Sequence, residues 1–171
     1  MMILISGSNG IGKSVYAEQL CARAAHPRYY IATMVPQNEE NDRRIEKHRR
    51  QRAGLDFQTL EVPCRVGGLS IPEDALVLLE DASNLLANLV FSEHGTAQQA
   101  LDEIHALRGR CRHLLVVTIS GLDEGSYDGE TAEYIRSMAW LNERLFDLAD
   151  TAVELKHGKP VIRKGNLDDF S

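Results

Sequence analysis

The most specific chemical signature of the chain lies in its first fifteen residues. A short apolar run over residues 2–6 leads into Gly-x-x-x-x-Gly-Lys-Ser at residues 7–14, and a helical apolar pattern follows. This order of strand, glycine-rich loop and helix is typical of a loop that wraps around the phosphates of a nucleotide. The backbone N–H groups of such a loop, together with the start of the helix, point at the anion.

Individual positions of this loop have expected parts in binding. Gly7 and Gly12 permit backbone angles and close approaches that a Cβ atom would block. Lys13 is expected to reach the β- and γ-phosphates, and Ser14 to offer its hydroxyl to Mg²⁺. The other loop residues expected to contact the nucleotide are Ser8, Asn9, Gly10 and Ile11. The sequence therefore predicts a site for a nucleoside triphosphate with Mg²⁺, without naming the reaction.

A second candidate group ends a later apolar run. Residues 75–79 are unbroken in their apolar character and are followed by Glu80 and Asp81. Ligands of parallel sheets bind at the carboxyl ends of strands, so one of these carboxylates is expected to face the Mg²⁺ beside Ser14. We favour Glu80 for the metal and Asp81 as the N-cap of a helix that starts near Ala82, but the sequence leaves this choice open.

The third candidate is a highly charged segment, residues 38–52. As a helix it has one large apolar residue, Ile45, so it cannot cover a core in the usual way. Arg44, His48 and Arg52 recur at i, i+4 and i+8 and would form one stripe. Such a stripe suits a polyphosphate, because arginines neutralise a leaving pyrophosphate while an imidazole nitrogen attacks phosphorus. On composition alone, a solvated helix whose charges pair with its own glutamates is the slightly favoured alternative.

Composition restricts the classes of partner. The formal net charge of -6 argues against a general nucleic-acid or membrane-surface binder. No apolar run approaches the ~20 residues of a membrane span, and no basic segment precedes the first strand as in a signal peptide. Three widely spaced cysteines fit no zinc pattern and are typical of reduced thiols in a cytoplasmic protein.

The elements that must position these groups alternate between strand and helix. Strands are predicted at 2–6, 29–32, 57–62, 75–79, 113–118, 151–155 and 160–163, and helices at 13–25, 38–52, 82–93, 96–108 and 130–149. This pattern predicts an α/β fold: a single P-loop nucleotide-binding domain over residues 1–171, with a mostly parallel sheet flanked by helices and a C-terminal β-hairpin. Residues 166–171 are expected to form a loose acidic tail. Surface or helix-terminal positions are expected for His26, His94, His105 and His113.

Taken in order, these residues resemble the bifunctional adenosylcobinamide kinase / adenosylcobinamide-phosphate guanylyltransferase family of cobalamin biosynthesis. The resemblance runs nearly end to end. It rests on residues 2–5 before the loop, residues 30–33, Arg44-Ile45 with His48-Arg49 and Arg52, Thr59-x-Glu61-x-Pro63, residues 78–80 with Asn88-Leu89, residues 116–118, Asn142-x-x-Leu145, and Ala149-Asp150-x-x-Val153.

The resemblance implies two reactions. The first phosphorylates the aminopropanol hydroxyl of a corrinoid with ATP or GTP, and in the second a histidine attacks GTP, releases pyrophosphate and passes GMP to the corrinoid phosphate. His48, the one histidine in the matching helix, is implied to carry the GMP, with Lys13 as the second catalytic residue. Nucleotide contacts beyond the loop are implied for Thr33, Arg44, Arg49, Arg52, Glu61 and Glu80. The resemblance also implies a homotrimer.

Some positions depart from the family pattern. Lys47 precedes a single His48 where the family often has adjacent histidines, and Phe57 replaces a tryptophan. Residues 119–127 replace an Asn-Glu-Val-Gly type of loop that is expected to shape the substrate site, which leaves open the acceptor and whether both activities are retained. Another small-molecule kinase or NTPase, or a nucleotide-binding regulatory protein, are the alternatives. Since no Asn-Lys-x-Asp motif is present, the choice between ATP and GTP is also open.

Overall fold

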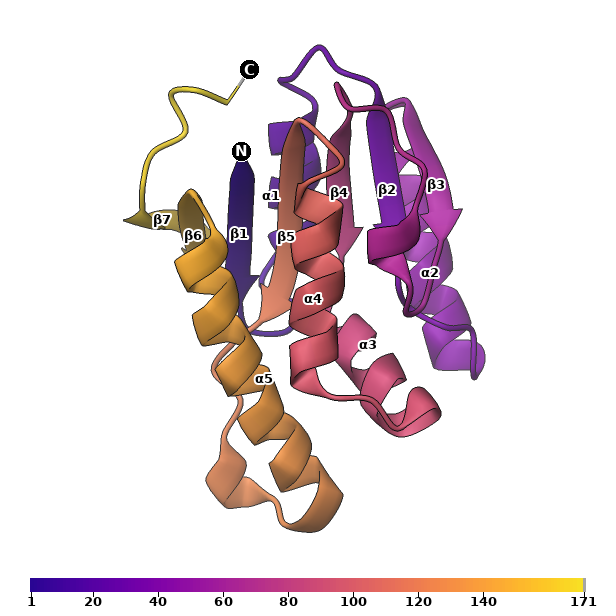
Figure 1. Ribbon diagram of the computed structural model, residues 1–171, viewed down its shortest axis with the longest axis vertical. Helices are drawn as coiled ribbons and strands as arrows, with labels where there is room; N and C mark the ends of the chain where they lie inside the picture. The colour runs from indigo at the N-terminus through magenta and orange to yellow at the C-terminus, as the bar shows by residue number, and fades with distance from the viewer. Residues whose placement is uncertain (171) are drawn as a thin grey trace.

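The computed structural model describes residues 1–170, and one seven-stranded sheet organises them (Figure 1). The strands are β1 (Met2–Gly7), β2 (Arg28–Ala32), β3 (Phe57–Glu61), β4 (Leu76–Glu80), β5 (His113–Ile119), β6 (Thr151–Lys156) and β7 (Lys159–Lys164). The α-helices are α1 (Lys13–Cys21), α2 (Glu39–Arg52), α3 (Ala82–Ala87), α4 (Ala97–Arg108) and α5 (Gly129–Leu148). Three short helical turns complete the elements: η1 (Val66–Gly68), the π-helical η2 (Asn88–Ser92) and η3 (Glu124–Ser126).

The strand order is β3-β2-β4-β5-β1-β6-β7. All neighbouring pairs are parallel except β6 and β7, which form the antiparallel C-terminal hairpin. The α/β fold predicted from the sequence is therefore confirmed. In the register, Gly7 lies opposite Ile119 and Glu80 lies opposite Val117, so the ends of β1 and β4 lie on either side of the end of β5. The glycine-rich loop and the later carboxylate consequently emerge at the same edge of the sheet.

Each face of the sheet has its own hydrophobic core. Met2 and Leu4 pack with α3, α4 and α5 on one face, while Ile3 and Ile5 pack with α1 on the other. In Figure 1, α3, α4 and α5 lie in front of the sheet and α1 lies behind it. Burial on both faces explains why β1, β4 and β5 have continuous apolar runs rather than alternating ones.

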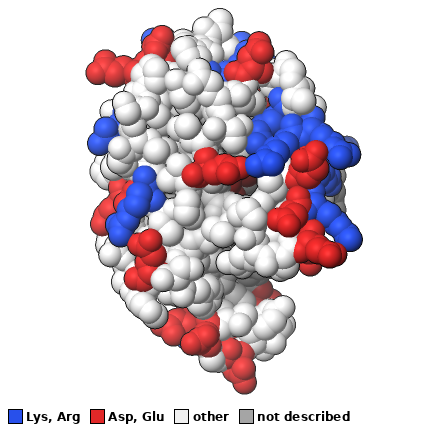
Figure 2. Space-filling model, turned by 90° about the vertical axis from the view of Figure 1, so that its right-hand side faces the viewer, with Lys and Arg blue, Asp and Glu red and all other residues white. Residues whose placement is uncertain are grey.

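Helix α2 covers neither core, as its composition predicts. Only Arg52 is buried in this helix. Its first turn is acidic and its later part basic, and Figure 2 shows these Lys and Arg side chains gathered on the face that carries α2, with acidic side chains beside them. Three intrahelical ion pairs are present: Arg43 with Glu39, Arg44 with Glu40, and Arg50 with Glu46. Within residues 1–170, no helix combines the length and apolar character needed to cross a membrane.

Two expectations about the periphery were wrong. Residues 166–170 are not a loose tail, because Phe170 is 8 % exposed and packs into the core on the α1 side. Its ring stands edge-on to the imidazole of His113, with centroids 5.1 Å apart. His113, expected at the surface, is buried at the start of β5. The hairpin carries the chain past Thr151, whose hydroxyl donates to the carbonyl of Asn166; Ser171 lies outside the described residues.

Two predicted helices are shorter than expected. Helix α1 ends at Cys21 rather than at residue 25. The helix predicted over 82–93 is regular only to Ala87 and continues as the π-helical turn η2. Because one turn of wider helix shifts the side chains relative to the α-helical pattern, the sequence period alone does not locate this change.

Candidate active site

The glycine-rich loop owes its shape to two different properties of glycine. Gly12 has φ +96°, a left-handed conformation that side-chain-bearing residues rarely adopt, although a Cβ there would meet nothing within 4 Å. At Gly7, where φ is +156°, space is restricted as well: a Cβ would lie 3.0 Å from Ile11 Cγ2 and 3.2 Å from the Leu155 carbonyl oxygen. The loop therefore favours glycine at both positions, at Gly12 for its backbone angle and at Gly7 for its backbone angle and close packing.

Lys13 lies within the curve of this loop. Its ammonium donates a hydrogen bond to the Ser8 carbonyl oxygen at 2.7 Å. Burial lowers the pKa of Lys13, and the negative charges of Asp81 and Glu80 oppose that shift. The Lys13 side chain is thus held between the loop and the carboxylates of Glu80 and Asp81.

A cavity of about 480 Å³ lies between the loop, α2 and the strand ends. The loop and the start of α1 contribute Asn9, Gly10, Gly12, Lys13, Ser14 and Val15. Helix α2 contributes Arg44, Ile45, Lys47, His48, Gln51 and Arg52. The remaining lining residues are Tyr30, Ala32, Met34, Glu61, Glu80, Asp81, Ser83, Asn84, Val117 and Ile119. The structure therefore brings all three candidate groups of the sequence to one cavity.

The two carboxylates at the end of β4 have different surroundings. Glu80 is 8 % exposed, accepts a hydrogen bond from the Ser14 hydroxyl, and accepts another from the Tyr30 hydroxyl at 2.6 Å. Burial raises the pKa of Glu80, although His48 and the two hydroxyl donors lower it. Asp81 instead accepts from the Asn84 backbone N–H at 2.7 Å and is the N-cap of α3. Only Glu80 has its side chain directed at the start of α1.

Thr33 lies behind this cavity rather than in it. Its side chain is fully buried, and its hydroxyl donates to the Asp81 carbonyl at 2.9 Å and accepts from the Asp81 N–H at 2.8 Å. The Thr33 hydroxyl is therefore engaged by the backbone of Asp81, and the direct nucleotide contact that the resemblance implied for Thr33 stays a prediction.

His48 faces the buried carboxylates. Its side chain is 27 % exposed, and its Nδ1 lies 4.0 Å from Glu80 Oε2. Glu18 of α1, which is 2 % exposed, also reaches this point: one oxygen of Glu18, one ring nitrogen of His48 and one oxygen of Glu80 lie within 4.8 Å of one another. Gln51 connects the two helices by donating to Glu18 Oε2 at 2.8 Å. Burial raises the pKa of Glu18 to about 7, against a lowering by Gln51.

Sequence reasoning missed Glu18. A signal was available, because Glu18 lies among the apolar positions of α1 at Ala17, Leu20 and Cys21, all of which are buried. A glutamate on the buried side of a helix is unusual unless it has a partner. Its partner belongs to α2, and the sequence does not show that these two helices meet.

The basic residues of α2 divide between two faces. Arg44 and Arg52 line the cavity with His48, as their i, i+4, i+8 spacing predicts. The Arg52 guanidinium lies 3.9 Å from the centroid of the Tyr30 ring. Arg49 does not line this cavity but pairs with Glu61 of β3, which does. The nucleotide contact implied for Arg49 stays a prediction.

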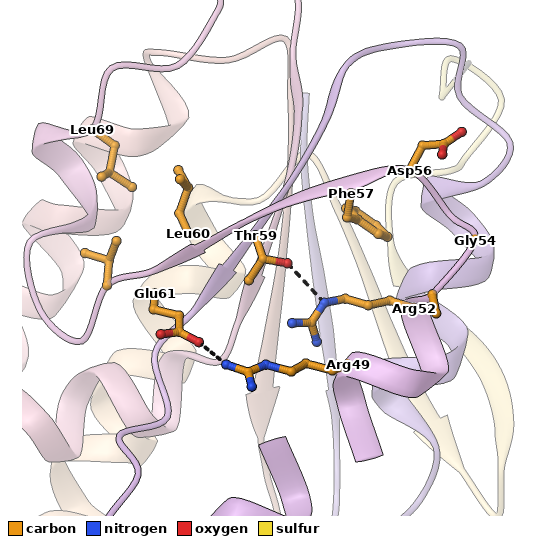
Figure 3. A pocket seen from close by; sticks show the side chains of 11 residues that line it. Arg49, Arg52, Gly54, Asp56, Phe57, Thr59, Leu60, Glu61 and Leu69 are labelled. Carbon is orange, nitrogen blue, oxygen red and sulfur yellow. Dashed lines mark hydrogen bonds and ion pairs between the residues drawn. The ribbon is translucent and has the colours of Figure 1, made fainter. Parts of the chain in front are cut away.

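A second cavity, of about 670 Å³, lies along β3, the edge strand of the sheet. Figure 3 shows Arg49 reaching Glu61 and Arg52 reaching Thr59, with Leu60 and Leu69 on another side. The Arg52 Nε donates to the Thr59 hydroxyl at 3.3 Å. Since Arg52 and Glu61 line both cavities, they form the boundary between them.

Residues 119–127, which depart from the family pattern, begin at the cavity of the glycine-rich loop and then run away from it. Ile119 lines that cavity, whereas residues 124–136 border a separate hollow of about 890 Å³. Arg136 pairs with Glu124 at 2.7 Å, and Tyr127 is 59 % exposed. In Figure 1 this segment and the start of α5 extend beyond the lower edge of the sheet. Its part in shaping a substrate site stays a prediction.

Comparison with known proteins gives a family and a fold. A family model described as cobinamide kinase / cobinamide phosphate guanyltransferase matches residues 3–162. No curated protein matches the sequence. Among solved structures, a prototypical ATPase from the type III secretion system of pathogenic bacteria has a TM-score of 0.56 at 10 % identity over 91 % of this chain. This chain spans about half, 51 %, of that ATPase. A structural-study target from Pyrococcus horikoshii OT3 has a TM-score of 0.55 at 10 % identity, covering 99 % of this chain and 89 % of its own. At this identity the two structures show similarity of fold alone.

Proposed function

Because the chain belongs to the cobinamide kinase / cobinamide phosphate guanyltransferase family of cobalamin biosynthesis, we propose that His48 is the residue that carries GMP between its two substrates. The observation that supports this assignment is the place of His48 in the cavity of the phosphate-binding loop. Of the histidines within residues 1–170, it alone lines that cavity. A neutral imidazole there can attack phosphorus while the loop holds the departing phosphates.

The nucleotide site in this proposal consists of the loop, residues 7–14, together with Arg44 and Arg52 of α2. Lys13 and the two arginines offset the charge that develops on the leaving pyrophosphate. Transfer then needs little chemistry beyond positioning, because the bond between histidine and phosphorus is itself reactive. Thr33 contributes by holding the backbone of Asp81. Arg49 and Glu61 contribute through their ion pair, which lies next to Arg52 at the boundary between the two cavities.

The residues beside Lys13 fit a bound Mg²⁺. The Ser14 hydroxyl and a carboxylate oxygen of Glu80 converge on one point, and oxygen ligands of this kind are those that Mg²⁺ prefers. When bound, the ion would neutralise part of the charge on the phosphates. Glu80 is favoured over Asp81 for this set because the Asp81 side chain caps α3 by accepting from the Asn84 N–H.

Covalent labelling tests the proposal. The protein is incubated with GTP labelled in the α-phosphate and examined for an acid-labile, base-stable adduct, the signature of a bond between phosphorus and histidine nitrogen. We expect the adduct in wild type and in His105→Ala, which alters an exposed histidine on α4, and no adduct in His48→Ala. An adduct that survives in His48→Ala, or none in wild type, refutes the assignment of His48.

The proposal extends to the assembly and the acceptor. We propose a homotrimer in the cytoplasm, as the resemblance implies, supported by exposed large apolar side chains on separate elements: Phe91, Tyr127 and Ile162. Light scattering after gel filtration measures the mass directly. Supplying adenosylcobinamide with either ATP or GTP identifies the phosphoryl donor and shows whether the altered 119–127 segment still admits the corrinoid.

A further inference from the structure

The imidazole of His48 has one nitrogen that cannot react. Its Nδ1 is buried, lies 4.0 Å from Glu80 Oε2, and has no hydrogen-bond partner among residues 1–170. The side chain is nevertheless 27 % exposed and lines the cavity. An attack on phosphorus therefore falls to Nε2. For Nε2 to offer a lone pair, the ring must be neutral with its proton on Nδ1.

A carboxylate facing Nδ1 would hold that proton in place. Glu80 Oε2 lies 4.0 Å from Nδ1 but already accepts from Tyr30, and the other Glu80 oxygen accepts from Ser14, so each oxygen has one remaining lone pair. Glu80 is also the carboxylate that the proposed function assigns to Mg²⁺. A second group is therefore needed to orient the ring.

Glu18 has the free acceptor. It is 2 % exposed, its Oε2 accepts from Gln51, and its Oε1 is buried with no hydrogen-bond partner in the described part of the chain. One oxygen of Glu18 and one ring nitrogen of His48 lie within 4.8 Å of each other, and Glu18 Oε1 and His48 Nδ1 are both buried without a hydrogen-bond partner in the described part of the chain. Gln51 follows His48 by three residues on α2, so its bond to Glu18 also sets the position of His48 relative to α1.

We propose that Glu18 is the positioning residue for His48: it accepts the Nδ1 proton as a hydrogen bond, which fixes the tautomer whose Nε2 attacks. This inference rests on the proposed role of His48. The Nε2 lone pair forms a bond to the α-phosphorus, and the bond from that phosphorus to the bridging oxygen breaks, its electron pair leaving on pyrophosphate. The ring keeps its Nδ1 proton and becomes positive, and the Glu18 carboxylate balances that charge. When a phosphate oxygen of the acceptor attacks, the pair returns to Nε2.

Glu18→Gln tests this arrangement with little change in shape. Its new amide oxygen can still accept from Gln51, which turns the amide N–H groups toward Nδ1. The ring must then carry its proton on Nε2, where no lone pair remains. We expect the rate of adduct formation from labelled GTP to fall on the order of 10³-fold, by analogy with the loss caused by reversing the tautomer of a catalytic histidine. The kinase rate, in which the corrinoid hydroxyl and not His48 is the acceptor, should fall far less than the rate of adduct formation.

A second readout reports the tautomer directly. In protein labelled with ¹⁵N-histidine, long-range ¹H–¹⁵N spectra distinguish the two tautomers, and His48→Gln assigns the His48 signals among the six histidines. At pH 8, wild type should show Nδ1–H and Glu18→Gln should show Nε2–H. Glu46→Gln, which alters an exposed residue paired with Arg50, is the matched control and should change neither rate nor spectrum.

The outcomes separate the two proposals. An unchanged tautomer, an adduct rate within threefold of wild type, or equal losses of both activities in Glu18→Gln would overturn the role of Glu18. Absence of any adduct in wild type would instead refute the assignment of His48 as GMP carrier, and the spectra would still decide whether Glu18 holds the Nδ1 proton.

Discussion

Replacing Glu18 by Gln should stabilise the folded protein, and increasingly so at higher pH. Burial raises the pKa of Glu18 from its ordinary 4.5 to about 7. The folded state therefore binds this proton more tightly than the unfolded state. Stability linked to Glu18 is complete below pH 4.5 and is lost as the pH rises through 7, because the buried carboxylate must then be ionised.

The magnitude follows from these two values. A difference of about 2.5 in pKa corresponds to about 3 kcal/mol when the carboxylate is fully ionised in both states. The penalty is about 1 kcal/mol at pH 5 and about 3 kcal/mol at pH 8, so it grows by about 2 kcal/mol over this interval. Gln is nearly isosteric with Glu and can still accept from Gln51, so Glu18→Gln removes the penalty while leaving the packing of α1 intact.

Urea denaturation of nucleotide-free, Mg²⁺-free protein at pH 5, 6, 7 and 8 measures this effect. The midpoint of Glu18→Gln should exceed that of wild type by about 1 M more urea at pH 8 than at pH 5. Glu46→Gln, which removes an exposed carboxylate, should show no such trend. A difference between wild type and Glu18→Gln that is the same at all four pH values would refute the argument that Glu18 is a buried carboxylate. Such a stable variant would also show that a lost adduct does not come from unfolding.

Three further outcomes are expected. Lys13→Ala should abolish phosphoryl transfer and lower adduct formation by at least ~100-fold without altering the circular dichroism spectrum, because Lys13 neutralises phosphate charge; retained turnover would contradict the site. Phe170→Ala should lower the free energy of unfolding by about 2–3 kcal/mol in chemical denaturation, since the ring is buried against His113; a change under 0.5 kcal/mol would mean that the tail is loose after all. Asp81→Ala should cost about 1 kcal/mol in the same assay through loss of the bond from the Asn84 N–H, while Asp81→Asn should recover most of it.

Local patterns predicted much of the fold because they act over short distances along the chain. The unbroken apolar runs that became β1, β4 and β5 reflect burial on both faces, which any parallel sheet between helices requires. The shape of the loop follows from the positions of Gly7 and Gly12. The position of Asp81 before α3 favoured it as the N-cap. The sequence left open whether Glu80 or Asp81 faces the metal.

Other features depend on contacts between distant segments. Residues 166–170 look loose by composition, but the antiparallel β7 leads them past Thr151 and Phe170 into the core beside His113. The surroundings of Thr33 and Arg49 have the same origin: each side chain meets a partner from a distant segment, Asp81 at the N-cap of α3 or Glu61 at the end of β3.

The sequence by itself determined the ligand class and the α/β architecture. A phosphate-binding loop and the periodicity of strands and helices can be recognised from residues that are neighbours in the sequence. It also determined that Arg44, His48 and Arg52 share one stripe, since helical geometry requires it. Only the tertiary structure decided which way that stripe faces. It placed His48 against Glu18 and Glu80, which come from α1 and β4, and a hydrogen-bonding environment made by three separate elements cannot be read from any one of them.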